Sequence, residues 1–146
     1  MRLLVLGLSL ALAACAGIET ILKCDDCFEV QVVRIIDGDT LDTSRGVMRL
    51  YGVQAPEIGQ RCAKKATNRL RGLAGDTIRI EVGPRTADQY GRMLAYVYTQ
   101  DGMSIDEVLI REGLATAWTR DGQHRDYLVQ LERDARNKGG VCLWNQ

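Results

Sequence analysis

Five short segments in which apolar and polar residues alternate constrain the fold of this chain more than any other feature. Such alternation is typical of half-buried β-strands, because successive side chains of a strand point to opposite faces. Only the turn signals Asp37-Gly38-Asp39 and Ser44-Arg45-Gly46 separate the first three segments, so we expect a meander of three strands. The five predicted strands cover residues 28–36, 40–43, 47–53, 77–82 and 93–98.

Three further segments have the residue spacing of helices. Residues 61–73 place apolar side chains on one stripe and are followed by Gly75. The second helix is predicted over 104–112, with Ser104 and Glu107 as a capping box, and the third over 127–138. Gly83-Pro84 predicts a turn that ends the fourth strand. The pattern predicts a mainly β fold with helices, of the α+β class: a five-stranded OB-fold barrel plus three helices.

Residues 1–14 are predicted to be a signal peptide rather than part of the fold. The apolar run from Leu3 to Leu12 is shorter than the roughly 20 residues that a membrane-spanning helix needs. Small residues before Cys15 resemble a bacterial lipobox, in which the cysteine is acylated. We expect an exported lipoprotein of the cell envelope, periplasmic or at the cell surface, whose lipid anchor holds it to the membrane. The alternative is cleavage at an ordinary site, which leaves a secreted protein. Residues 15–27 are then a tether and residues 28–146 one domain.

Export makes the remaining cysteines candidates for disulfides. Apart from Cys15 there are four, an even number that permits two disulfides in three connectivities. We favour Cys24–Cys27 and Cys62–Cys142, the second joining the first predicted helix to the C-terminus. Cys24 and Cys27 could instead form half of a zinc site or a redox pair, but the sequence has no second CxxC, no nearby histidine and no thioredoxin-like pattern.

The charge balance excludes a global attraction to polyanions. Lys and Arg number 19, as do Asp and Glu, and removal of Arg2 with the signal peptide leaves 18 against 19. Because a near-neutral protein has no overall field that draws in a nucleic acid, any such attraction must be local. The densest basic stretch contains Lys64, Lys65, Arg69 and Arg71, and we interpret it as a solvated helix face.

Three separate segments carry the residues with chemistry. They are Asp37-Gly38-Asp39-Thr40, then Arg49 with Gly52-Val53-Gln54-Ala55-Pro56-Glu57, then Asp88-Gln89-Tyr90-Gly91-Arg92. Two arginines can neutralise a phosphate, a carboxylate can bind a hard cation, and a second carboxylate can act as a general base. This combination is what phosphodiester hydrolysis requires.

The three segments, in this order and spacing, resemble the staphylococcal nuclease (thermonuclease) family from about Val30 to Trp144. The family pattern is Asp-Gly-Asp-Thr, then Arg-Leu-x-Gly-Ile-Asp-(Thr/Ala)-Pro-Glu, then Asp-x-Tyr-Gly-Arg-x-Leu-Ala-Tyr. A C-terminal Gly-x-x-Leu-Trp, here residues 140–144, is similar too. The resemblance implies an OB-fold core with three helices. It also implies a calcium-dependent endonuclease that cleaves the P–O5′ bond of DNA and RNA and leaves 3′-phosphates.

The resemblance also implies a role for each residue that matches. Asp39, with the backbone carbonyl of Ala55, would hold Ca²⁺ or another divalent cation through hard oxygen atoms. Glu57 would accept a proton from the attacking water or orient it. Arg49 and Arg92 would bind the phosphate oxygens, for which the planar guanidinium suits better than an ammonium.

Supporting roles are expected of four more residues. Asp37 and Thr40 would orient Asp39 from behind, although Asp37 could also merely cap the turn. Tyr90 would pack and donate one hydrogen bond to a phosphate. Trp118 would stack on a base or, equally, pack in the core. His124, the only histidine, is expected at the surface.

Gln54 departs from the family pattern, which has a metal-binding aspartate at this position. A neutral amide oxygen replaces a carboxylate, so we expect weaker binding of Ca²⁺ if Gln54 still faces the ion. Three outcomes remain open: activity at weaker affinity, use of another divalent ion, or loss of catalysis. We expect a monomeric nuclease acting on DNA or RNA, and no protein partner is evident. The alternatives are a catalytically weak or silent OB-fold lipoprotein that binds nucleic acid or a protein, and a structural lipoprotein domain.

Overall fold

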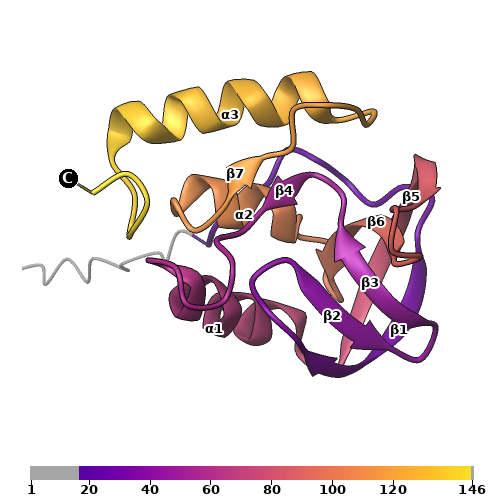
Figure 1. The fold of residues 1–146 in the computed structure, drawn as a ribbon. Helices are drawn as coiled ribbons and strands as arrows, with labels where there is room; N and C mark the ends of the chain where they lie inside the picture. The colour runs from indigo at the N-terminus through magenta and orange to yellow at the C-terminus, as the bar shows by residue number, and fades with distance from the viewer. Residues whose placement is uncertain (1–16, 146) are drawn as a thin grey trace, which may run out of the picture.

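The protein folds into a closed five-stranded barrel with three helices to one side of it (Figure 1). The computed structural model describes residues 17–145, so the predicted signal peptide and Cys15 lie outside the described residues. The barrel strands are β1 (Phe28–Ile35), β2 (Thr40–Thr43), β3 (Gly46–Leu50), β5 (Thr77–Ala87) and β6 (Met93–Thr99). Around the barrel the order is β1-β2-β3-β6-β5, with β3 and β6 parallel and the other neighbours antiparallel. The predicted α+β class and barrel are confirmed.

The helices pack between the barrel and a small two-stranded sheet. They are α1 (Ala63–Ala74), α2 (Ile105–Arg111) and α3 (Arg125–Lys138), and the small sheet pairs β4 (Val53–Gln54) with β7 (Thr116–Ala117). α2 is central, since it contacts β6, α1 and α3. Fully buried side chains of the barrel and of α1 form the core, among them Leu41, Met48, Leu50, Leu70, Ile78 and Ile80. Burial of each such side chain contributes about 1.5–3 kcal/mol. Within residues 17–145, no helix has the length and apolar character to span a bilayer.

The predicted turn at Gly83-Pro84 is wrong, because β5 continues through it to Ala87. Gly83 lies against the ring of Tyr51, and a Cβ at this position would come within 2.5 Å of the ring. Glycine therefore lets the strand pass over Tyr51 instead of ending it. Pro84 falls where the pairing with β6 shifts, between Val82 and Ala87, so its missing N–H removes no regular ladder bond.

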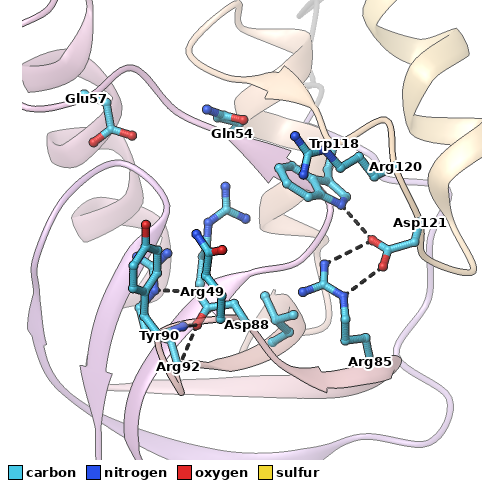
Figure 2. Close-up of a pocket in the computed structure, with 12 residues that line it drawn as sticks. Arg49, Gln54, Glu57, Arg85, Asp88, Tyr90, Arg92, Trp118, Arg120 and Asp121 are labelled. Carbon is cyan, nitrogen blue, oxygen red and sulfur yellow. Dashed lines mark hydrogen bonds and ion pairs between the residues drawn. The ribbon is translucent and has the colours of Figure 1, made fainter.

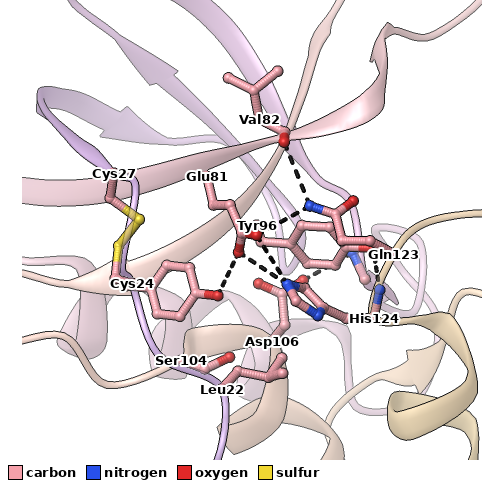
Figure 3. Close-up of polar contacts among 12 residues, drawn as sticks. Leu22, Cys24, Cys27, Glu81, Val82, Tyr96, Ser104, Asp106, Gln123 and His124 are labelled. Atoms are coloured by element: carbon pink, nitrogen blue, oxygen red, sulfur yellow. Dashed lines mark hydrogen bonds and ion pairs between the residues drawn. A yellow bond between two sulfur atoms is a disulfide. The ribbon is translucent and has the colours of Figure 1, made fainter.

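A buried carboxylate divides the predicted third strand, residues 47–53, into β3 and β4. Asp106 of α2 is completely buried, and its Oδ1 accepts the backbone N–H of Gly52 at 2.8 Å. Its Oδ2 accepts the N–H of Val97 at 3.1 Å. Because a side chain of α2 takes the Gly52 N–H, the chain bends there and β4 leaves the barrel. Burial raises the pKa of Asp106 to about 6. Figure 3 shows Asp106 beside Tyr96 and His124.

The predicted capping box of α2 is only half formed. The Ser104 hydroxyl accepts the Glu107 N–H at 3.3 Å, but the Glu107 carboxylate does not return to Ser104. It accepts instead the N–H groups of Ile21 and Leu22, which precede β1. The hydroxyl of Thr20 accepts the Ser104 N–H at 3.0 Å. The middle of the predicted tether is therefore held against the start of α2.

Both favoured disulfides are present in the structure. Cys24–Cys27 has a Cα–Cα distance of 5.5 Å and Cys62–Cys142 one of 5.9 Å. The second bond joins the start of α1 to the segment after α3, 80 residues later. It ties the C-terminal segment to the helix that follows the predicted metal-binding loop.

Candidate active site

Six of the predicted site residues line one cleft of about 530 Å³ (Figure 2). These are Arg49, Gln54, Glu57, Tyr90, Arg92 and Trp118. They come from β3, from β4 and the loop after it, from the β5–β6 turn and from the residue after β7. Residues far apart in the sequence thus converge because the parallel β3–β6 pair and the β4–β7 pair bring their segments together.

Asp39 lies behind Arg49, at the start of β2, and is buried. Its Oδ1 accepts the Thr40 hydroxyl at 2.9 Å, and its Oδ2 accepts the Ala55 N–H at 2.8 Å. Asp37 caps the turn, since its Oδ1 accepts the Asp39 N–H at 3.0 Å. Burial raises the pKa of Asp39, against the effect of the Arg49 guanidinium. The predicted cluster of Asp37, Asp39, Thr40 and Ala55 is therefore one hydrogen-bonded unit beneath the cleft.

Three contacts hold the Arg49 side chain in place. Its Nη1 donates to the carbonyl of Leu50 at 2.9 Å, and its Nη2 lies 3.5 Å from Oδ2 of Asp39. Its guanidinium also lies 5.2 Å from the centre of the Trp118 ring. Only 11% of the side chain is exposed, so the charge is concentrated at the cleft and screened little by solvent.

Asp88 plays the corresponding part for Arg92. Its Oδ2 accepts Nε of Arg92 at 2.6 Å, and its Oδ1 accepts the N–H groups of Tyr90 and Arg92. Burial acts to raise the pKa of Asp88, but the hydrogen bonds from Arg92 outweigh it and the pKa is lowered. Nη1 of Arg92 lies 3.4 Å from the Thr40 hydroxyl, which connects the turn to the Asp39 unit. Tyr90 is 74% exposed, with its ring 5.4 Å from the Arg92 guanidinium.

Gln54 and Glu57 stand at the opposite rim, above Arg49 in Figure 2. Both are exposed. The backbone N–H of Glu57 donates to Gln60, and among residues 17–145 no basic side chain forms an ion pair with its carboxylate. Glu57 is therefore available to a solvent molecule or a substrate in the cleft.

The sequence reasoning missed three residues of the cleft wall: Arg85, Arg120 and Asp121. Asp121 binds Arg85 through two hydrogen bonds and also accepts Nε1–H of Trp118. Arg120 lies 5.4 Å from the Trp118 ring. Arg85 was missed because the predicted turn at Gly83-Pro84 placed it outside the strand, whereas it lies in β5. Arg120 and Asp121 could have been predicted from their position two and three residues after Trp118, which was itself a candidate.

The basic stretch of α1 does not contribute to the cleft. Lys64 and Lys65 are exposed, Arg69 pairs with Glu112 at 2.7 Å, and Arg71 donates to Asn68. The interpretation as a solvated helix face is in keeping with these positions.

The side chains beside the cleft include oxygen atoms of the kind that a hard cation takes as ligands. Within residues 17–145, no three side chains of His, Cys, Asp or Glu come together as a metal cluster. Asp39, however, has a raised pKa because burial, and also the nearby charge of Asp37, disfavour its ionised form. A cation would offset that unfavourable charge, and Gln54 would add a neutral oxygen at most.

A small barrel with two arginines and an unengaged carboxylate around one cleft has the groups needed to bind a phosphodiester and serve its hydrolysis. The model of the family described as "Staphylococcal nuclease homologue" matches residues 47–146. The chain belongs to this family, and it is therefore an enzyme of the nuclease class.

Relatives that are named as nucleases align with the chain over most of their length. It is 36% identical over 120 residues to an "Uncharacterized endonuclease" of Escherichia coli O157:H7, covering 79% of this chain and 76% of the relative. It is 33% identical to the "Micrococcal nuclease" of Shigella flexneri, covering 81% and 74%. It is 34% identical to the "Thermonuclease" of Staphylococcus intermedius, covering 79% and 75%.

Proposed function

We propose that the protein is an exported nuclease that hydrolyses phosphodiester bonds of DNA or RNA with the help of a divalent cation, Ca²⁺ or a similar ion. The observation that carries the proposal is the convergence of Arg49, Arg92 and Glu57 on one cleft. Two guanidinium groups and one unengaged carboxylate can bind a phosphate and serve its hydrolysis.

Arg49 and Arg92 bind the phosphate oxygens and neutralise the charge that grows in the pentacoordinate transition state. Their carboxylate partners orient them before the substrate arrives. Asp88 engages Nε of Arg92, so the Nη atoms can turn toward the phosphate. Asp39 and the Leu50 carbonyl hold Arg49 by its Nη atoms instead, which fixes its guanidinium at the edge of the cleft. This preorganisation removes the cost of ordering long side chains during the reaction.

Glu57 accepts a proton from the attacking water or orients it, and its exposed position at the rim leaves room for that water. When bound, the cation would be held by Asp39, the carbonyl of Ala55 and, if it reaches, Gln54; it supplies a Lewis acid that draws charge from the phosphate. We propose products with 3′-phosphates, as expected for attack that expels the 5′-oxygen.

The decisive experiment measures cleavage of a single-stranded DNA oligonucleotide in Ca²⁺, Mg²⁺ and Mn²⁺. Glu57→Gln should lower kcat by about 10²–10⁴-fold as a lost general base, and Arg92→Ala by about 10²–10³-fold as a lost transition-state donor. Glu29→Gln on β1 and Arg71→Ala on α1, both exposed and away from the cleft, are the matched controls. End-group analysis of the fragments tests for 3′-phosphates.

A folded protein that cleaves nothing in any of the three ions would reject the proposal. It would instead favour the rival function, a silent OB-fold that binds nucleic acid, for which the neutral Gln54 is the motivating observation. In that case Glu57→Gln would leave oligonucleotide binding unchanged.

We also propose that the protein is a monomeric lipoprotein acylated at Cys15, with the membrane as its second partner. Mass spectrometry of the mature N-terminus and the membrane fractionation of Cys15→Ser test this. A soluble, unacylated protein from the unaltered gene would mean ordinary secretion. Light scattering of the purified domain tests the monomer.

A further inference from the structure

Asp121 accepts hydrogen bonds from two different side chains of the cleft wall at once (Figure 2). Nε1–H of Trp118 donates to its Oδ1 at 2.7 Å. Arg85 donates from Nε to Oδ2 at 2.8 Å and from Nη2 to Oδ1 at 3.2 Å. Arg85 comes from β5 and Trp118 from the residue after β7, so one carboxylate joins two separate parts of the fold.

We propose that Asp121 is a positioning residue that fixes Trp118 and Arg85 as one rigid substrate-binding wall, on the side of the cleft away from Glu57. The proposal rests on the proposed function and deepens it. The ligand class is a single-stranded nucleic acid, because an indole face stacks on an exposed base, and a paired base is not free to stack on it. A guanidinium nearby serves the neighbouring phosphate.

The hydrogen bonds of Asp121 hold Arg85 and Trp118 in place before a substrate binds. An arginine that was free in solution would lose conformational freedom on binding a phosphate, and the hydrogen bonds from Arg85 to Asp121 remove most of that cost in advance. Hydrogen bonds from Arg85, then from Trp118, outweigh burial and lower the pKa of Asp121 to about 2. The carboxylate thus stays ionised and keeps both donors at any ordinary pH.

If Asp121 had a purely structural role, its loss would lower the melting temperature of the protein. The Arg85 and Asp121 side chains are each 39% exposed, and an ion pair this accessible contributes little to folding stability. Loss of Asp121 should therefore hardly change the melting temperature. If its function is to position the wall, the loss appears in substrate binding and in the environment of Trp118.

The test is Asp121→Asn, whose single side-chain carbonyl oxygen cannot replace a carboxylate that serves both donors. Asp126→Asn, an exposed aspartate paired with Arg125, is the control with the same change of charge. KM and kcat for a single-stranded DNA oligonucleotide are measured. The Kd of the same oligonucleotide is measured for Glu57→Gln protein, which cleaves slowly, with and without the Asp121→Asn change. Acrylamide quenching of Trp118 is followed in a Trp144→Phe background, which leaves one tryptophan.

We expect KM and Kd to rise about tenfold for Asp121→Asn, as for one lost charge-assisted hydrogen bond, with kcat changed less than about twofold. Quenching of Trp118 should increase, and Asp121→Glu should restore part of the affinity. Trp118→Phe, which keeps a stacking ring but lacks the N–H, should raise KM non-additively with Asp121→Asn. If Asp121→Asn does not fold, Trp118→Phe and Arg85→Lys carry the same prediction.

Values of KM, Kd and quenching equal to those of Asp126→Asn would overturn the proposal. An enzyme that proves inactive would end the proposed function alone. The Kd in Glu57→Gln protein and the quenching in the Trp144→Phe background need no cleavage, so they still decide the role of Asp121.

Discussion

Asp106 makes the stability of the protein depend on pH in an unusual direction. Its carboxylate is completely buried, and two backbone N–H groups, of Gly52 and Val97, are its hydrogen-bond donors. Burial, the dominant effect, raises its pKa from 3.8 to about 6, although these bonds and the charge of His124 oppose the shift. The folded protein therefore holds this proton at a pH where the unfolded chain has lost it.

The sign and size of the effect follow from proton linkage. Between the unfolded and folded pKa values the native state binds more protons, so the contribution of Asp106 to stability falls as the pH rises. The difference of about two units corresponds to about 3 kcal/mol, at 1.36 kcal/mol for each unit. The stabilisation by protonation is complete below about pH 3.8 and is lost by about pH 6.

The perturbation is Asp106→Asn, which cannot titrate. Urea unfolding gives the free energy of unfolding of both proteins at each pH from acid to neutral. The quantity of interest is the value for the original protein minus the value for the variant. Carboxylates with lowered pKa values, such as Glu81 and Asp88, stabilise in the opposite sense, but they occur in both proteins and cancel in the difference. This difference should fall by about 3 kcal/mol as the pH rises through the window.

The asparagine amide fits poorly or well between the two N–H groups to the same degree at every pH. It therefore adds a constant to the difference in free energy of unfolding and does not change how that difference varies with pH. A difference that stays level with pH, or that rises, would refute the reasoning that burial dominates at Asp106.

Two further predictions concern the cation and the C-terminus. Gln54→Asp should lower the Ca²⁺ concentration for half-maximal cleavage by roughly tenfold, because affinity follows the number of charged ligands. Gln54→Asn is the neutral control. An unchanged calcium titration would mean that position 54 does not face the ion. Replacing both Cys62 and Cys142 with Ser should lower the free energy of unfolding by about 2–5 kcal/mol, since the bond closes a loop of 80 residues. Denaturant unfolding measures this loss and compares it with the loss in the Cys24/Cys27 double variant, whose bond spans 3 residues. Equal losses for the two pairs would contradict the loop-length argument.

The barrel was predictable because strand alternation and turn residues act over a few neighbouring positions. The cleft residues Arg49, Glu57 and Arg92 were predicted from the resemblance to the family pattern, since each lies in one of its short motifs. The extension of β5 was not predictable in this way, because Gly83 is explained by the ring of Tyr51, a residue far away in the chain. A glycine in a strand and a glycine in a turn look the same until the partner is known.

Two acidic residues of α2 show the same limit more sharply. Asp106 and Glu107 look like ordinary acids of a helix's first turn, which stabilise it through its dipole. In the structure both are fully buried, and each accepts N–H groups from distant segments: Gly52 and Val97 for one, Ile21 and Leu22 for the other. Their function depends on long-range contacts that no local pattern contains.

The cleft resolves the apparent conflict between a neutral chain and a polyanionic substrate. Each of three cleft arginines is held by its own carboxylate: Arg49 by Asp39, Arg92 by Asp88 and Arg85 by Asp121. These acids cancel most of the long-range field, so little electrostatic steering is expected. What they provide is orientation, since each guanidinium is fixed before a phosphate arrives. Under the proposed function, the cleft would therefore act through preorganised hydrogen-bond donors rather than through net positive charge.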